Sequence, residues 1–253
     1  MMNYITQMLD LSLFQWVAVI ITAFLVGFSK TGIGGMVMIA IPLLASAFGG
    51  KDSTGVLLPM LLVGDLFAIW YYRRSVQWKN VFTPLPWALV GLALGVVIGN
   101  FISDKTFVLL IGIIVLLCTG ILVYTEIKGK NFHVPNDAWF YILVGILSGF
   151  ASMMGNAAGP IFSIYLLALG FQKNNYMGTN AWFFFLINFS KLPLQIFAWH
   201  NIGIKNLTIT LTLLPVITIG AVLGYFILKK INDKYFRYIV IGMTAISALR
   251  LLI

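Results

Sequence analysis

Apolar residues in this chain form long, nearly unbroken runs instead of alternating with polar residues. Several runs exceed the roughly 18 residues that indicate a membrane-spanning helix. Helices and closed barrels are the structures that satisfy the backbone in lipid, and solid apolar runs favour helices. The pattern therefore predicts an all-α polytopic membrane protein. We expect ten segments, at about 11–28, 33–49, 54–72, 81–102, 106–125, 138–154, 157–171, 176–199, 206–229 and 235–252.

The segments fall into two similar halves. Residues 99–123 align with 228–252, and at the same offset Pro86 meets Pro215 and Gly95 meets Gly224. Earlier in each half Gly55 meets Gly178, and Asp65 falls opposite Asn188. We interpret residues 1–125 as the first repeat, 126–137 as a linker and 138–253 as the second repeat. Since each repeat holds about five segments, giving 8–10 membrane segments in all, the second is expected to be inverted relative to the first.

The basic residues support this orientation. Alternate counting of the segments gives ten Lys and Arg on one side and four on the other, whereas fusing segments one with two and six with seven gives seven on each side. Because cytoplasmic loops carry an excess of Lys and Arg, the first count is favoured. It predicts that both termini lie outside. The ten are Arg73, Arg74, Lys79, Lys128, Lys130, Lys173, Lys229, Lys230, Lys234 and Arg237.

The composition agrees with a membrane protein and excludes several other classes. Hydrophobic residues make up 60% of the 253 residues and charged residues 9%. The net charge of +9 is explained by basic loops, so we expect no nucleic-acid partner. Cys118 is the one cysteine, and neither His133 nor His200 has a second ligand at metal spacing, so no metal or cofactor is expected. No catalytic motif is present, and we expect no enzyme activity.

Short, glycine-interrupted segments at matching places in two halves point to the binding site of a transporter. The first break is "GFSKTGIGG" at 27–35. Its glycines free the backbone to leave helical geometry near the midplane, where helix N-terminal amides bind anions. Ser29, Lys30, Thr31 and Gly32 are the candidate binding residues. The alternative is that Lys30 lies in a surface turn.

The second break, "MGNAAGP" at 154–160, contributes Gly155, Asn156 and Ala157. Proline is favoured just inside a helix start, so Asn156 is expected to cap a helix that begins near Ala157. An ordinary turn outside the membrane is the alternative. Whether segments one and two, or six and seven, span fully or are re-entrant is left open.

Three ionisable residues, Lys30, Asp65 and Lys191, fall within the apolar segments or at a break. Such residues are costly in lipid, which indicates function. Lys191 shares a helix face with Asn188, and Asn180 precedes them on the same segment. Asp65 is the expected partner of Lys191 or a proton-coupling group; a purely structural role of Lys191 is the alternative.

The two breaks, together with "YMGTNAWFFFLINFSKLPLQ" at 176–195, resemble the sulfite exporter TauE/SafE family of membrane transporters. The resemblance runs from about 15 to 252 and is more specific in the second half. It implies a carrier of small sulfur-containing anions, such as sulfite, thiosulfate or organosulfonates, in the cytoplasmic (inner) membrane.

We therefore expect export of a small sulfur-containing anion by alternating access. A proton- or sodium-coupled importer of another solute and a non-transporting membrane assembly subunit are the alternatives. The expected partners are the anion and the lipid bilayer. The sequence leaves open which anion is carried, its direction, the coupling ion and the oligomeric state, a homodimer included.

Overall fold

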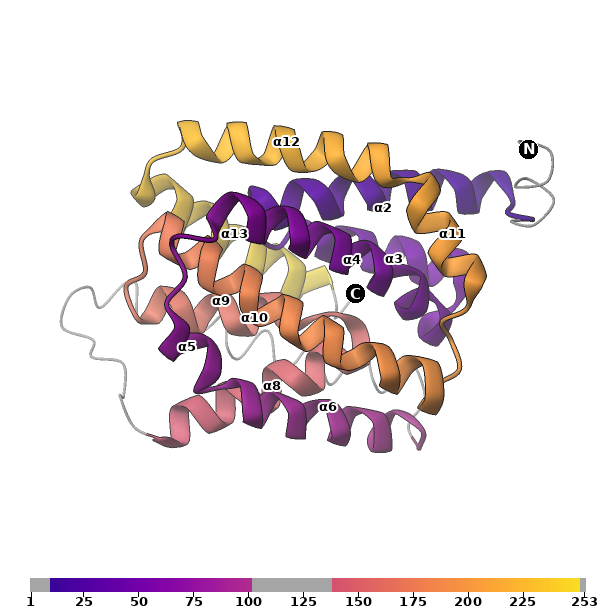
Figure 1. Ribbon diagram of the computed structural model, residues 1–253, viewed down its shortest axis with the longest axis horizontal. Coiled ribbons are helices and arrows are strands. Elements are labelled where there is room, and N and C mark those ends of the chain that lie inside the picture. The colour runs from indigo at the N-terminus through magenta and orange to yellow at the C-terminus, as the bar shows by residue number, and fades with distance from the viewer. Residues whose placement is uncertain (1–9, 102–137, 251–253) are drawn as a thin grey trace.

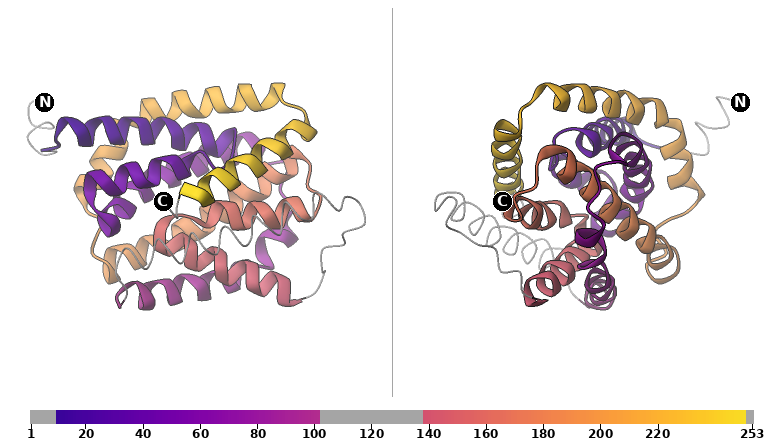
Figure 2. Two further views of the ribbon diagram at one scale, coloured as in Figure 1. Left: turned by 180° about the vertical axis from the view of Figure 1, so that it is seen from behind. Right: turned by 60° about the vertical axis from the view of Figure 1, so that its left-hand side comes forward.

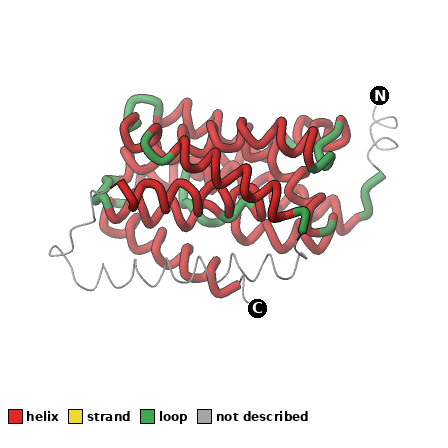
Figure 3. Tube along the Cα trace, turned by 90° about the horizontal axis from the view of Figure 1, so that it is seen from below, coloured by secondary structure: helices red, strands yellow, loops and turns green. Residues whose placement is uncertain are grey.

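The computed structural model describes residues 10–101 and 138–250, and these ranges contain helices joined by short loops (Figure 3). The predicted fifth segment and the linker lie outside them. No strand occurs in the described ranges, so the all-α prediction is confirmed for them. The helices are α2 (Leu13–Thr31), α3 (Val37–Phe48), α4 (Gly50–Tyr72), α5 (Trp78–Phe82), α6 (Leu85–Gly99), α8 (Ala138–Gly155), α9 (Ala158–Ala168), α10 (Lys173–Pro193), η2 (Leu194–Ala198), α11 (Ile204–Thr212), α12 (Leu214–Lys230) and α13 (Asp233–Arg250).

The helices lie roughly parallel in pairs (Figure 1). Helix α2 packs along α12 at the top of that view, α8 packs along α6 at the bottom, and α4 and α10 cross between them. Each pair joins one helix of the first half with one of the second. The interior is therefore built jointly by the two halves, and Figure 2 shows α11 to α13 wrapping around it.

Glycines allow the two outer pairs to approach closely. A Cβ on Gly27 of α2 would lie 2.0 Å from the carbonyl oxygen of Ile217, and one on Gly149 of α8 would lie 1.9 Å from that of Ala88. Gly27 and Gly149 are counterparts in the repeat, and so are Ala88 and Ile217. These matching contacts are what the repeat leads us to expect; the inverted orientation of the halves stays a prediction.

Two segments expected to be single helices are divided. Segment 81–102 falls into α5 and α6, and segment 206–229 into α11 and α12, which are bent by 54°. The matched prolines explain the division, because Pro86 and Pro215 lie in the first turn of α6 and α12, where proline is tolerated and a preceding helix cannot continue.

Two of the expected segments form helices shorter than the thickness of a membrane. Helices α3 and α9 have 12 and 11 residues, which at 1.5 Å per residue is roughly 17–18 Å, against about 30 Å of hydrocarbon. Five helical stretches of the described chain are long and apolar enough to span, or six with the bent α11–α12 pair. Helices α3 and α9 are thus about half the length of a span; α3 begins just after the first predicted break and α9 begins within the second.

The loops gather at two ends of the molecule. At one end Tyr71, at the end of α4, stacks on Tyr225 of α12, and Lys173, at the start of α10, donates hydrogen bonds to the carbonyl oxygens of Leu228 and Ile231. At the other end Lys51, at the start of α4, donates to Asn100 after α6. The first end also carries Arg73 and Arg74 after α4 and Lys229 and Lys230 at the end of α12. The membrane side of each end stays a prediction.

Candidate functional site

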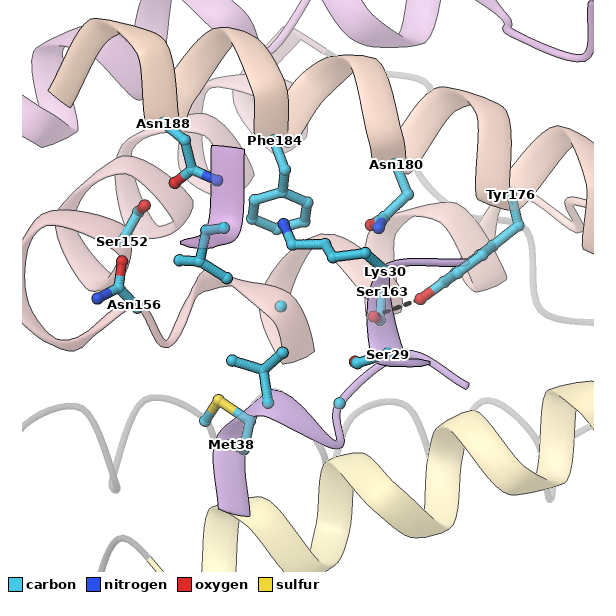
Figure 4. Close-up of a pocket in the computed structure, with 15 residues that line it drawn as sticks. Ser29, Lys30, Met38, Ser152, Asn156, Ser163, Tyr176, Asn180, Phe184 and Asn188 are labelled. Carbon is cyan, nitrogen blue, oxygen red and sulfur yellow. Dashed lines mark hydrogen bonds between the residues drawn. The ribbon is translucent and has the colours of Figure 1, made fainter. Parts of the chain in front are cut away.

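A small cavity of about 60 Å³ lies where the two breaks meet α10 (Figure 4). Its volume holds a few water molecules or one small anion. Residues from α2, α3, α4, α8, α9 and α10 surround it. They are Ser29, Lys30, Gly34, Gly35, Val37, Met38, Leu61, Ser152, Asn156, Gly159, Ser163, Tyr176, Asn180, Phe184 and Asn188.

Helix α10 provides one wall of the cavity. Tyr176, Asn180, Phe184 and Asn188 follow each other at intervals of four residues, which places them on one helix face. The Tyr176 hydroxyl lies 2.5 Å from the hydroxyl of Ser163 on α9. Figure 4 shows these side chains aligned along the α10 ribbon, facing the ends of the broken helices.

Lys30 supplies the positive charge of the cavity. Its ammonium lies 2.6 Å from Asp65 Oδ1 and 4.9 Å from the centre of the Phe184 ring. Asn188 Nδ2 donates to the other oxygen of Asp65 at 2.7 Å. The side chain of Lys30 is 11% exposed and that of Asp65 is fully buried. The lysine is therefore inside the protein, and the surface-turn alternative is wrong for the side chain of Lys30.

Lys191 lies beside the cavity and does not line it. It is fully buried, and its ammonium donates to the Ser152 carbonyl oxygen at 2.8 Å and to Asn156 Oδ1. Both acceptors belong to the end of α8, where a cation is stabilised by the helix dipole. The expected pairing of Asp65 with Lys191 is wrong, because Lys30 occupies Asp65 and Lys191 is directed at the second break.

Asn156 does not cap α9 as expected. The cap residue is Ala157, no side chain provides a capping hydrogen bond, and α9 begins at Ala158. Asn156 has a φ of 55°, in the left-handed region that asparagine tolerates better than most residues, and its backbone N–H donates to Ser152 O, which closes α8. Its side chain is held by Lys191, so the residue ends one helix instead of starting the next.

The remaining predicted residues divide into two groups. Ser29, Asn180 and Asn188 line the cavity with Lys30 and Asn156. Thr31 does not, since its hydroxyl donates to Ala221 O at 2.6 Å. Gly32 contacts α12, where an added Cβ would lie 2.7 Å from Gly224 Cα, Ala157 is buried, and Gly155 lines a neighbouring cavity.

Two short helices, α3 and α9, each begin at the cavity. Gly34, Gly35 and Val37 at the start of α3, and Gly159 in the first turn of α9, are lining residues. Helix N-termini carry unpaired N–H groups and about half a positive charge, which together attract anions. Gly159 has open space where a Cβ would be, so an anion can approach the α9 backbone there.

Unpaired polar groups complete the site. Asn156 Nδ2 and Asn180 Oδ1 are buried without a hydrogen-bond partner. A side-chain amide carries both donor and acceptor ends, so Asn180 can also present its NH₂ group. Lys30, Asp65 and Lys191 have a formal sum of one positive charge, which a monoanion would neutralise. The described residues hold no group of three metal-ligating side chains.

Sequence reasoning missed four lining residues that matter here, namely Ser152, Ser163, Tyr176 and Phe184. The four-residue spacing from Asn180 and Asn188 could have identified Tyr176 and Phe184. Ser152 and Ser163 carry no comparable signal, because short hydroxyl side chains are common in membrane helices.

The fold and the cavity define a polytopic helical membrane protein with a buried cationic cavity built from broken helices. A family model described as Sulfite exporter TauE/SafE matches residues 19–251, and the chain belongs to this family. The family is one of membrane transporters of sulfur anions, not of enzymes. Comparisons with curated proteins and with solved structures returned no match.

Proposed function

We propose that the protein exports a small sulfur-containing oxyanion across the inner membrane by alternating access, with the anion bound in the cavity at Lys30. The observation that carries the proposal is the position of the Lys30 ammonium in a buried cavity that the start of both α3 and α9 adjoins. One cation, helix amides and the asparagine amides suit an anion with several oxygen atoms.

The negative charge of the anion favours export as the direction of transport. The inside-negative potential is worth ~2.3 kcal/mol per elementary charge per 100 mV, so an anion leaves the cell without a coupling ion. One oxygen of Asp65 forms the ion pair with Lys30 and the other accepts a hydrogen bond from Asn188, which suits a carboxylate that stays charged. Asp65 is then the fixed counter-charge of Lys30, and the proton-coupled importer has less support.

The test is counterflow of radiolabelled sulfite in liposomes that contain the purified protein. We expect saturable uptake that unlabelled sulfite or thiosulfate inhibits. Asn180→Leu should reduce uptake at least tenfold, because it replaces an amide of the cavity wall by an apolar group. Asn174→Leu, on an exposed residue of the same helix, is the matched control.

Three results would count against the proposal. Absence of flux from folded wild-type protein is what a non-transporting assembly subunit would give. Flux that does not saturate would indicate a channel. Equal flux of Asn180→Leu and Asn174→Leu would remove the cavity from the transport path.

A further inference from the structure

A second cavity of about 70 Å³ lies next to the central one, toward the end of the molecule that carries Lys51. The two cavities share their dividing wall. At the end of α8, Asn156 lines the central cavity, and Met154 and Gly155 line the second cavity. On α3, Met38 lines the central cavity, and Ile41, one turn later, lines the second. The second cavity therefore lies on the other side of the turn that contains Met154, Gly155 and Asn156.

The second cavity contains a cation without a carboxylate partner. The Lys51 ammonium donates to Asn100 Oδ1 at 3.2 Å and lies 4.9 Å from the centre of the Trp199 ring. The one ion pair formed among the described residues is that of Lys30 and Asp65, so no described carboxylate lies within 4.0 Å of Lys51. Within the described ranges, an amide oxygen and an aromatic face are the groups that contact its charge.

Two further residues that line this cavity, Trp199 and Gly50, carry donor groups. Trp199 is 7% exposed, lines the cavity, and its indole N–H has no hydrogen-bond partner. Gly50 also lines it and is the first residue of the 23-residue helix α4, whose N-terminal amides carry partial positive charge. A buried indole N–H is normally paired, so its lack of a partner points to a ligand that accepts its hydrogen bond.

We propose that this cavity is a second anion site, at which the transported oxyanion binds Lys51 and the Trp199 N–H on its way to or from the central cavity. The inference rests on the proposed transport function and adds a binding step to it. Each of the two sites consists of a lysine and the N-terminus of a helix. The turn at Met154–Asn156 separates them.

The experiment measures the KM for sulfite counterflow in proteoliposomes. Lys51→Gln and Trp199→Phe should each raise KM about five- to tenfold with little change in the maximal rate, since the central site is untouched. Lys51→Arg should keep the wild-type KM. Lys205→Gln is the matched control, because Lys205 is an exposed lysine at the same end that lines a different cavity. Thermal unfolding checks that each variant is folded.

The outcomes separate the two proposals. No counterflow by the folded wild type overturns the transport function and this site with it. Wild-type counterflow with equal KM for Lys51→Gln and Lys205→Gln overturns the second site alone. The same holds if 1 M salt abolishes the KM difference between Lys51→Gln and wild type, because screening by salt would identify a surface-charge effect. If Lys51→Gln unfolds, the result for Trp199→Phe decides.

Discussion

Two lysines of the interior, Lys30 and Lys191, lie close to the same cavity, but they have different contacts. Lys30 lines the cavity and is paired with a carboxylate, whereas Lys191 does not line the cavity and donates to the end of α8. We therefore propose that Lys30 binds the anion and that Lys191 stabilises the second break.

Lys191→Met should mainly reduce stability. The substitution leaves Asn156 Oδ1 without its donor, whereas the Ser152 carbonyl keeps the backbone N–H of Asn156, and an unpaired buried acceptor costs about 1–3 kcal/mol. We expect a lower thermal midpoint, while the Kd for sulfite of the folded protein stays within a few-fold of wild type. A variant with an unchanged midpoint and no sulfite binding would show that Lys191 contacts the anion instead.

The residues of the site were largely predictable, but their pairing was not. Lys30, Asp65 and Lys191 are conspicuous because ionisable residues are rare in apolar segments. Which lysine meets Asp65 depends on how α2, α4 and α10 pack, and a long flexible side chain reaches several neighbours. Asn156 was misassigned for a related reason: a residue that ends one helix is adjacent in sequence to the residue that starts the next.

At the scale of elements, close helix pairs depend on glycines at matching positions. Gly27 and Gly149 leave no room for a Cβ against Ile217 and Ala88. These contacts fix the outer pairs α2–α12 and α6–α8, which support the broken helices.

Gly27→Ala and Gly149→Ala should therefore each reduce the free energy of unfolding by about 1–3 kcal/mol, the usual cost of overpacking. Gly203→Ala is the control, since nothing lies within 4 Å of the position of its Cβ. The measurement is the thermal midpoint in one detergent. A midpoint for Gly149→Ala equal to that of Gly203→Ala would contradict the close packing of α6 on α8.

The apolar pattern of the sequence predicted the helices. The points at which they are divided depend on the tertiary structure. The splits at Pro86 and Pro215 could have been predicted from the matched prolines. The helix changes from α to π geometry after Pro193, which proline favours because it lacks the N–H of a regular helix. Nothing in the apolar pattern distinguishes the half-length α3 and α9 from spanning helices.

At the scale of the molecule, the two ends differ in charge, and this predicts the orientation. The end formed by α4, α10 and α12 carries Arg73, Arg74, Lys173, Lys229 and Lys230, and the other end carries Lys51 and Lys205. The first end is expected to face the cytoplasm.

Cysteine labelling tests this orientation in a Cys118→Ala background. We expect a membrane-impermeant thiol reagent, applied to intact cells or spheroplasts, to label Asp10→Cys and Lys205→Cys. Arg74→Cys and Asn174→Cys should react after permeabilisation alone. The reverse pattern would invert the orientation and, with it, the side at which the Lys51 cavity opens.

We propose that the charge of Lys30 binds the transported anion. A double variant distinguishes this binding role from the structural role of the Lys30–Asp65 ion pair. Removing one partner of a buried pair costs about 3–5 kcal/mol, whereas replacing both by neutral side chains is often tolerated. Lys30→Met with Asp65→Asn removes both charges and leaves Asn188 an oxygen to donate to.

The most direct measurement is sulfite counterflow by this double variant, with its thermal midpoint recorded alongside. We expect a midpoint near wild type, well above that of Lys30→Met alone, and counterflow reduced more than tenfold. Counterflow at the wild-type rate by the folded double variant would contradict it.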